Sequence, residues 1–540
     1  MSMSLGVLSC FSSSVSFDYI MELLEEIGKL IVNYVSSNIL LCLNYFINGL
    51  ENFNLEDLSE MLIASIVLLC ATVFFYYMWR TRGMPPGPWG LPLVGYLPWI
   101  DKKKPYLSLM ELYQDYGGIC TIRLGEVVAI VVSEPHYVKE ALSQEVLTGR
   151  APLWLTHGLM NNNGLIAVEG PKWREQRKFA INCMKSLGAV KVGGRRAVME
   201  SRILEGVRQT FQMIDERRQN GPFDPKPILS HTIGNIMNCI VFGKSFSVDD
   251  QTWTWLQHMA EEGVKLVGVA GPLNFMPYLR ILPQYRKLLE FIRSGQKRTH
   301  DVYRSIACDD NRTSDNILSY YLEAISACRG QYFDEAQMLH LLADMFGAGV
   351  DSTLATFRWV ILYLALHPEV QECVYEEVSC VIGKDKEPNM DHLSQCPFTE
   401  ATIMETMRIR PVVPLGIPHG ATKDTQLAGF RVPEGTMIIV NQWTLHHDTK
   451  YWDDPEIFDP KRFISPEGTV KRKDSLNPFQ TGKRSCFGEE LAKMVLFLFT
   501  SSIVLRYRLD VEGPATIALE GECGITLCPG PQALTFNLRP

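Results

Sequence analysis

Residues 479–488 read Phe-Gln-Thr-Gly-Lys-Arg-Ser-Cys-Phe-Gly, and this stretch decides how the rest of the chain is interpreted. Gly482 can adopt backbone angles closed to other residues, and Gly488 carries no side chain where a bulky group would approach. The backbone can therefore wrap around the Cys486 sulfur and present it to a flat partner. Arg484 supplies a cation able to bind a carboxylate, as a haem propionate would require. A thiolate on haem iron pushes electron density that favours O–O cleavage.

Residues 489–498 are largely apolar and predict a buried helix, so Cys486 would lie at a helix N-terminus whose dipole stabilises the thiolate. A lone cysteine is usually a buried small hydrophobe. This stretch resembles the haem-binding signature of the cytochrome P-450 family, Phe-x-x-Gly-x-Arg-x-Cys-x-Gly, at every fixed position. The resemblance implies haem b with Cys486 as axial iron ligand, Phe479 beside the cofactor, and a mainly α fold with a small β region over about residues 85–540.

Composition excludes several other classes of protein. The 540 residues are 46% hydrophobic, so a large core is available, and the net charge of −8 argues against nucleic acid as a partner. The 14 cysteines lack the regular spacing of a disulfide framework or a zinc site, which favours a reducing compartment. We expect Cys523 and Cys528 to be two loop or strand thiols.

Residues 61–79 form an uncharged apolar run long enough to cross a bilayer as a helix. Acidic residues precede it and Arg80 and Arg82 follow, so the positive-inside rule places the rest of the chain in the cytosol. The resemblance to microsomal members of the family implies that the membrane is the endoplasmic reticulum. A buried core helix is the alternative. Residues 80–98, with prolines at 85, 86, 88 and 92, predict a stiff extended hinge before a catalytic domain at 99–540. Residues 1–60 could be a second membrane segment, an interfacial helix or a dispensable extension.

Residues 334–366 contain no proline and predict one long helix, ended by His367-Pro368. Its middle holds Gly347 and Gly349, which each cost about 1 kcal/mol against alanine. A local opening of the helix, with Gly349 leaving room for a diatomic ligand, would explain them. Asp351 and Ser352 supply an acid and a hydroxyl that could relay protons. The segment resembles the family's oxygen-activating motif, except that Ser352 replaces the usual threonine; a kinked core helix is the alternative.

For two further groups of residues, the expected roles follow only from the resemblance to the cytochrome P-450 family. It implies that Glu405, Arg408 and Arg462 form a buried cluster that stabilises the core beneath the haem without acting in catalysis. It assigns propionate contacts to Trp173, Arg177, Arg150, His419 and Arg484. For His419 the alternative is a loop histidine bonded to nearby backbone. His446 and His447 are adjacent, so their side chains diverge and surface exposure is expected rather than a metal site.

Basic residues are expected to gather on the thiolate side of the haem, namely Arg174, Lys178, Lys185, Lys471, Arg472, Lys473 and Lys483. A basic patch on an acidic protein indicates docking to an acidic electron donor. The resemblance implies NADPH–cytochrome P-450 reductase, with cytochrome b5 as a second candidate. The sequence has no Gly-x-Gly-x-x-Gly dinucleotide fingerprint, so electrons from NADPH must come through a partner.

The positions that line substrate sites in the family are mainly apolar here: Leu153, Trp154, Leu155, Leu159, Phe346, Val412, Val413, Leu415, Ile525 and Leu527. Residues 155–158 and 346–351 look similar to arthropod ecdysteroid hydroxylases of the microsomal type. We therefore expect a monooxygenase that inserts one oxygen atom from O2 into a lipophilic substrate such as an ecdysteroid. The alternatives are a xenobiotic-oxidising monooxygenase, an oxygen-independent haem-thiolate isomerase and a non-catalytic haem sensor.

Overall fold

The computed structural model describes residues 63–65, 67–68, 71–72, 81–155, 160–266, 271–513 and 519–540. The chain divides into two units, Met1–Arg82 and Gly83–Pro540. Residues 1–60 and most of the expected anchor at 61–79 lie outside the described residues. Among those described, the helix Glu335–Leu366 is long and apolar enough to cross a membrane, but 72% of its apolar window is buried inside the unit.

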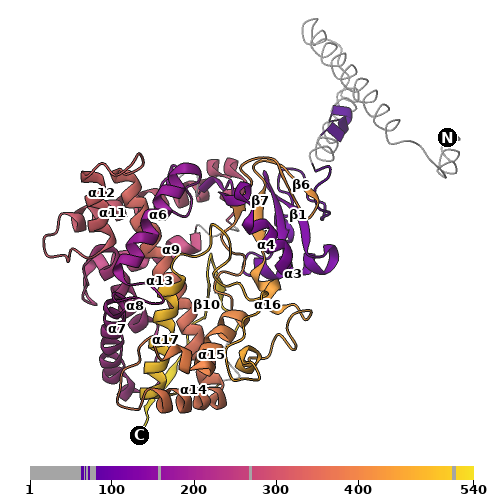
Figure 1. The fold of residues 1–540 in the computed structure, drawn as a ribbon. Coiled ribbons are helices and arrows are strands. Elements are labelled where there is room, and N and C mark those ends of the chain that lie inside the picture. Colours follow the sequence, from indigo (N-terminus) through magenta and orange to yellow (C-terminus); the bar gives the residue numbers. More distant parts are fainter. Residues whose placement is uncertain are drawn as a thin grey trace, which may run out of the picture. The chain divides into compact units, whose positions relative to one another are not determined.

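The unit Gly83–Pro540 is mainly helical. Most of its helices pack on one side, and the five-stranded sheet lies on the other together with the helices Pro105–Tyr116 and Pro135–Ser143 (Figure 1). The α-helices are α3 (Pro105–Tyr116), α4 (Pro135–Ser143), α6 (Gly170–Leu187), α7 (Arg196–Arg217), α8 (Lys226–Phe242), α9 (Gln251–Leu266), α10 (Pro272–Phe275), α11 (Pro283–Ala307), α12 (Ile317–Ser326), α13 (Glu335–Leu366), α14 (Pro368–Val381), α15 (Pro397–Ile409), α16 (Gln442–His447) and α17 (Glu489–Arg506). Short 3-10 helices are η2 (Leu97–Trp99), η3 (Glu145–Thr148), η4 (Arg218–Asn220), η5 (Pro277–Ile281), η6 (Leu393–Gln395) and η7 (Pro460–Phe463).

Within the described residues, the strands form one five-stranded sheet and three two-stranded ribbons. They are β1 (Ile119–Leu124), β2 (Val127–Val132), β3 (Gly149–Arg150), β4 (His419–Gly420), β5 (Thr425–Leu427), β6 (Phe430–Val432), β7 (Met437–Val440), β8 (Tyr507–Val511), β9 (Glu522–Cys523), β10 (Leu527–Cys528) and β11 (Leu534–Leu538). The larger sheet runs β1-β2-β7-β4-β3, with only the β2–β7 pair parallel. The expectation of a mainly helical fold with a small β region is confirmed.

Helix α13 runs through the centre of the core. The side chain of Asp334 caps its N-terminus by accepting a hydrogen bond from the Gln337 N–H at 2.8 Å, and His367-Pro368 ends it, as the sequence predicts. The helix packs against α8, α15 and α17. It is continuous through Gly347 and Gly349, so the expected local opening is wrong.

The proline-rich segment is part of the compact unit from Gly83 onward. The carbonyl of Pro86 accepts a hydrogen bond from the Thr121 N–H on β1 at 3.0 Å, and a Cβ added to Gly87 would lie 1.8 Å from the Thr121 carbonyl oxygen. The extended prolines therefore lie against the sheet rather than spanning a gap. The glycine is required because the two backbones are too close for any side chain.

Candidate haem-thiolate site

The loop before α17 has a hydrogen-bonded shape that fixes Cys486. The carbonyl of Phe479 accepts from the Cys486 N–H at 2.8 Å, and the carbonyl of Gly482 accepts from the Ser485 N–H at 3.2 Å. Gly482 has a φ of +78°, and a Cβ there would lie 2.0 Å from the Leu142 carbonyl oxygen. Glycine is therefore needed at this position both for its backbone angle and for its close approach to α4.

Cys486 lies just before the N-terminus of α17, where Gly488 is the N-cap. Its side chain is exposed to solvent, although the protein atoms around it are dense enough to disfavour the thiolate. Burial raises the pKa of the Cys486 thiol, and the Gly488 N–H and Arg177 lower it in opposition. Backbone N–H groups at the N-terminus of α17 stabilise the thiolate, as expected, but the effect of burial is larger. The protein alone therefore does not lower the pKa of this thiol.

Three arginines, Arg150, Arg177 and Arg484, lie close enough to disfavour one another's charge. Arg484 is buried and donates to the carbonyls of Thr148 at 2.8 Å and Val168 at 2.7 Å. Burial, and then Arg150, lowers the pKa of Arg484 to about 8. Burial, and then Arg177, lowers the pKa of Arg150 to about 10.

His419 lies beside this cluster, because it pairs with Arg150 across strands β3 and β4. Its Nδ1 bonds to the Leu147 carbonyl at 2.8 Å, so the backbone partner that the sequence left open is present. Burial, and then Arg150, lowers the pKa of His419 to about 3, which keeps the ring neutral at physiological pH. Its Nε2 is buried beside the Gln480 side chain, but the two groups do not form a hydrogen bond of good geometry.

These observations test whether the residues fit a haem. Burial and mutual repulsion lower the pKa values of Arg150 and Arg484 even with the Glu169 carboxylate nearby, and the buried Nε2 of His419 lacks a hydrogen bond of good geometry within the described part of the chain. A flat group carrying two carboxylates, with an iron that takes a thiolate, would satisfy both needs. The residues therefore fit haem.

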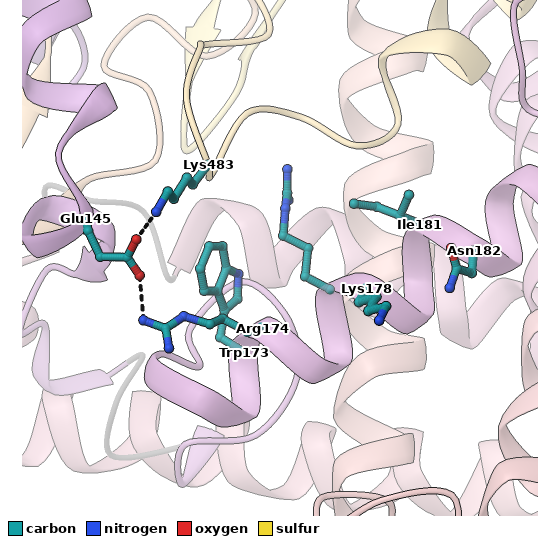
Figure 2. A pocket seen from close by; sticks show the side chains of 8 residues that line it. Glu145, Trp173, Arg174, Lys178, Ile181, Asn182 and Lys483 are labelled. Atoms are coloured by element: carbon teal, nitrogen blue, oxygen red, sulfur yellow. Dashed lines mark hydrogen bonds and ion pairs between the residues drawn. The ribbon is translucent and has the colours of Figure 1, made fainter.

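Trp173 connects the cluster to a surface pocket of about 330 Å³ on α6 (Figure 2). The guanidinium of Arg484 stacks on its ring at 4.0 Å, and that of Arg177 lies 5.9 Å from it. Arg177 donates to the Ser485 carbonyl at 2.6 Å, beside Cys486. Trp173 and Arg177 thus reach the thiolate loop from one face of α6, as their spacing predicts.

Arg174, Lys178 and Lys483 line the mouth of this pocket, where the Glu145 carboxylate pairs with both Arg174 and Lys483 (Figure 2). Other members of the expected basic patch have separate surroundings. Arg472 pairs with Glu400 at 3.6 Å, and Lys473 stacks on the Trp452 ring at 4.5 Å. The structure therefore brings Arg174, Lys178 and Lys483 together, whereas Arg472 and Lys473 contact other residues.

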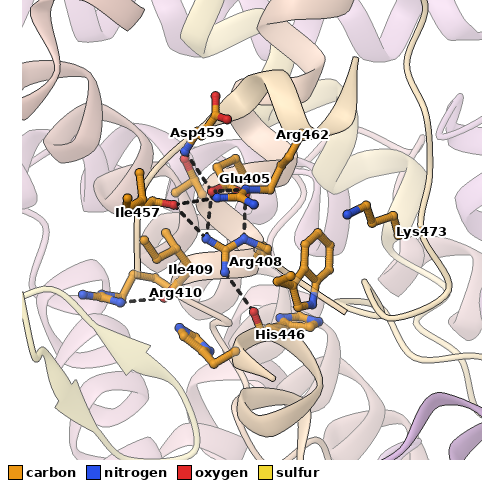
Figure 3. A network of polar contacts seen from close by, with 12 residues as sticks. Glu405, Arg408, Ile409, Arg410, His446, Ile457, Asp459, Arg462 and Lys473 are labelled. Atoms are coloured by element: carbon orange, nitrogen blue, oxygen red, sulfur yellow. Dashed lines mark hydrogen bonds and ion pairs between the residues drawn. The ribbon is translucent and has the colours of Figure 1, made fainter. Parts of the chain in front are cut away.

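Glu405, Arg408 and Arg462 form a buried polar network (Figure 3). Arg408 binds the Glu405 carboxylate through two nitrogens at 2.7 and 2.8 Å, and Arg462 binds it at 3.0 Å. Arg408 also donates to the carbonyls of His446 and Ile457. The network thus ties α15 to α16 and η7.

The expected surface exposure of His446 and His447 is wrong, because both are buried. His446 accepts a hydrogen bond from the Asn477 N–H at 3.1 Å, and His447 stacks on Trp443 at 4.1 Å. Burial lowers the pKa of His446 to about 3. Both residues are buried because the short helix α16 packs against the Arg408 network. The fact that they are adjacent in sequence could not predict this burial.

Asp351 is held by a residue that the sequence did not single out. The Thr526 hydroxyl, in the turn between β9 and β10, donates to its carboxylate at 2.6 Å. Burial raises the pKa of Asp351, and the Thr526 hydrogen bond lowers it in opposition. The Ser352 hydroxyl donates to the Ala348 carbonyl at 2.8 Å, one turn back on α13.

Gly349 has a packing reason that the sequence could not show. A Cβ at this position would lie 2.3 Å from Cε of Met237 on α8. The missing side chain thus allows α8 and α13 to approach closely, whereas around Gly347 no atom lies within 4 Å of such a Cβ among the described residues. The contact at Gly349 is with protein, not with open space.

The residues expected around a substrate divide among three places. Ile525 lies in the β9–β10 turn, and the Leu527 N–H donates to the Val412 carbonyl at 2.7 Å, which places Val412 beside it; Leu415 is buried in the main core. Val413 is half-buried beside Val412, and Leu153 is buried in the main core. Phe346 packs in that core against Phe242 and Trp253. Trp154 and Leu155 join a separate apolar cluster with α11. Leu159 lies outside the described residues.

Cys523 and Cys528 lie on β9 and β10 as free thiols. Two side chains that shape the site escaped prediction, Thr526 and Glu145. Each acts through a partner more than 20 residues away in sequence, so no local pattern marks it. The position of Thr526 beside Ile525, an expected substrate contact, was the only available signal.

Comparison with known proteins gives the family of the chain. The family model described as Cytochrome P450 matches residues 85–536. The chain is 36% identical to cytochrome P450 306a1 of Drosophila melanogaster over 84% of this chain and 89% of that protein. It is 28% identical to cytochrome P450 18a1 of the same species over 90% and 93%. It is 32% identical to cytochrome P450 2U1 of Bos taurus over 88% and 93%. With Cys486, its arginine cluster and the matched signature in one place, the chain belongs to the cytochrome P450 family and is a monooxygenase of that family.

Proposed function

We propose that this enzyme inserts one oxygen atom from O2 into a lipophilic substrate, and that the substrate is a steroid of the ecdysteroid type. When bound, haem supplies the oxygen-activating chemistry of the family. The observation that carries the proposal is the thiol of Cys486 held beside Arg177, which with the half-buried Arg150 and the buried Arg484 forms a cluster of three arginines. The remaining roles fall to residues of this chain.

Cys486 would hold the iron, and the loop hydrogen bond from its N–H to Phe479 would fix the direction of the sulfur. Arg150, Arg177, Arg484 and the Nε2 of His419 would bind the propionates, with Trp173 packed beneath Arg484. The propionate carboxylates would raise the pKa values of Arg150 and Arg484, which burial lowers.

Asp351 and Ser352 would hold and pass protons from consecutive positions on α13. The Thr526 hydroxyl keeps the Asp351 carboxylate in one orientation at 2.6 Å. Gly349 would contribute through the close packing of α8 on α13. The Glu405–Arg408–Arg462 network would stabilise the fold beneath the haem and would not act in catalysis.

The apolar side chains near the β9–β10 turn support a lipophilic substrate, with Val412, Leu415 and Ile525 as its first contacts and Val413 beside them. The similarity of residues 155–158 and 346–351 to arthropod ecdysteroid hydroxylases supports a steroid. The 36% identity to a Drosophila protein over most of both chains is consistent with an arthropod-type enzyme.

We further propose that residues 61–79 anchor the enzyme in the endoplasmic reticulum membrane with residues 83–540 in the cytosol. The apolar run and the arginines that follow it support this orientation. NADPH–cytochrome P450 reductase, and cytochrome b5 as a second donor, would dock at the mouth of the α6 pocket, where Arg174, Lys178 and Lys483 lie.

The test uses the purified full chain, loaded with haem, against a panel of steroids and apolar xenobiotics. We expect an ecdysteroid precursor to shift the haem absorbance at the lowest concentration. Its hydroxylation should require NADPH, the reductase and O2 together. Product formed without O2 would support an isomerase, and tighter binding of xenobiotics than of every steroid would contradict the steroid proposal.

A further inference from the structure

The turn between β9 and β10 brings an expected substrate contact next to the hydrogen-bond partner of an expected proton donor. Ile525 in this turn is half-buried and is the expected substrate contact. The next residue, Thr526, is 5% exposed and donates a hydrogen bond to the Asp351 carboxylate at 2.6 Å. One peptide bond therefore links a side chain expected to touch substrate to the hydroxyl that orients Asp351.

The residues after the turn are fixed by contacts with other elements. The Leu527 N–H donates to the Val412 carbonyl at 2.7 Å, and the Leu527 carbonyl accepts from the Trp359 indole N–H at 2.9 Å. Arg358 donates to the Gly530 carbonyl at 2.8 Å. Because Trp359 and Arg358 both belong to α13, β10 and the residues after it are attached to the helix that carries the expected proton donor.

A thiol completes the contacts of the Thr526 hydroxyl. The Cys528 Sγ lies 3.6 Å from Thr526 Oγ1. Because the single hydroxyl hydrogen of Thr526 is donated to Asp351, its oxygen accepts from the thiol. Burial, and then Asp351, raises the pKa of the Cys528 thiol to about 11, so the S–H is present at neutral pH. Hydrogen bonds in a chain strengthen one another, so the thiol favours the bond from Thr526 to Asp351.

The fixed position of Leu527 makes the hydrogen bond to Asp351 sensitive to any movement of the turn. A displacement of Ile525 must be absorbed by the backbone angles of Thr526, because Leu527 is held on two sides. The strength of a hydrogen bond falls steeply when the hydroxyl leaves its preferred distance and direction. A bound molecule that pushes Ile525 outward would therefore turn the Thr526 hydroxyl away from Asp351.

We propose that the β9–β10 turn couples substrate fit to proton delivery, with Ile525 as a specificity-determining residue and Thr526 as the positioning residue through which it acts on Asp351. This role rests on the proposed function, because it takes Ile525 as a substrate contact and Asp351 as a group that passes protons. A substrate that fits beside Ile525 leaves the acid oriented. A substrate that presses on Ile525 turns the acid away, so that reduced oxygen leaves as hydrogen peroxide.

The two outcomes differ in their products. With the acid oriented, NADPH, H+, O2 and a substrate RH give NADP+, water and ROH. With the acid displaced, NADPH, H+ and O2 give NADP+ and hydrogen peroxide, and RH is unchanged. The peroxide formed for each NADPH oxidised therefore measures how well Asp351 is oriented during turnover.

The experiment is a double-mutant cycle on the haem-loaded full chain, with the reductase and the steroid that binds most tightly in the panel above. Ile525→Trp enlarges the side chain against the bound steroid and should raise the peroxide formed for each NADPH about threefold or more. Thr526→Val should raise it as well, because the donor to Asp351 is removed. In I525W/T526V the tryptophan should add nothing to the effect of T526V. In I525W/T526S, which keeps the hydroxyl, the tryptophan should act as it does in the parent.

Val413→Trp is the matched control, because Val413 is a half-buried residue of the expected pocket that lies outside the turn. It should raise the peroxide ratio by the same factor in the parent and in T526V. Ile525→Phe is a milder second change at the same position. Hydrogen–deuterium exchange of the Leu527 N–H should be as slow in each variant as in the parent, which shows that the hairpin stays folded.

Two results would overturn the coupling. One is a peroxide ratio that I525W and I525F leave unchanged, and the other is an effect of I525W that is as large in T526V as in the parent. The proposed function fails in a different way, because a parent enzyme without a thiolate-type carbon monoxide spectrum or without product from any steroid would contradict that function. Normal product formation by the parent together with either of the two results would contradict the coupling alone.

Discussion

The hydrogen bond from Thr526 to Asp351 makes a residue-scale prediction. Replacing Thr526 with valine keeps the shape and removes the donor, so the pKa of Asp351, already raised by burial, rises further. A carboxyl group whose pKa is higher in the folded state than in the unfolded state stabilises the fold at pH values below its unfolded-state pKa. That stabilisation is lost as the pH rises through its folded-state pKa. Unfolding by urea should therefore show T526V less stable than the parent by about 1.5–3 kcal/mol at neutral pH.

The same comparison near pH 4 provides the contrast, because a protonated Asp351 depends less on the Thr526 donor. Thr526→Ser retains the hydroxyl and should restore most of the neutral-pH stability. In the reconstituted enzyme, T526V should also release more peroxide for each NADPH oxidised than T526S. A loss of stability that is the same at both pH values would contradict the assigned hydrogen bond.

At the scale of elements, the Glu405–Arg408–Arg462 network joins α15 to α16 and η7. Glu405→Gln leaves two buried guanidinium groups without a charged partner, which typically costs about 3–5 kcal/mol. We expect a large fall in the unfolding free energy and in haem retained after purification. The matched change Glu387→Gln breaks only the exposed pair with Arg208 and should cost about 1 kcal/mol or less.

The elements that the sequence predicted well are those encoded locally. Helix α13 was placed within one residue by the Asp334 cap and Pro368, and the Cys486 loop by its glycines and arginine. The burial of His446 and the contact of Gly349 with Met237 depend on elements far away in the chain. No local sequence pattern predicts such contacts, because they form only when distant elements pack together in the folded protein.

At the scale of the whole molecule, the proposed orientation makes Asn311 a marker of topology. Asn311-Arg312-Thr313 is a glycosylation sequon, and Asn311 is exposed between α11 and α12. A cytosolic unit never meets the lumenal glycosylation enzyme, so endoglycosidase should leave the mass of the expressed chain unchanged. A mass shift that Asn311→Gln abolishes would reverse the orientation.

The central claim is that Cys486 supplies the thiolate ligand of a haem iron, held by the arginine cluster around it. The most direct measurement is the reduced carbon monoxide difference spectrum of the full chain, compared with Cys486→Ser and with the control Cys523→Ser, which changes a thiol on β9. We predict that the thiolate-type absorbance is present in the parent and in C523S and is absent in C486S. Its persistence in C486S would contradict the account.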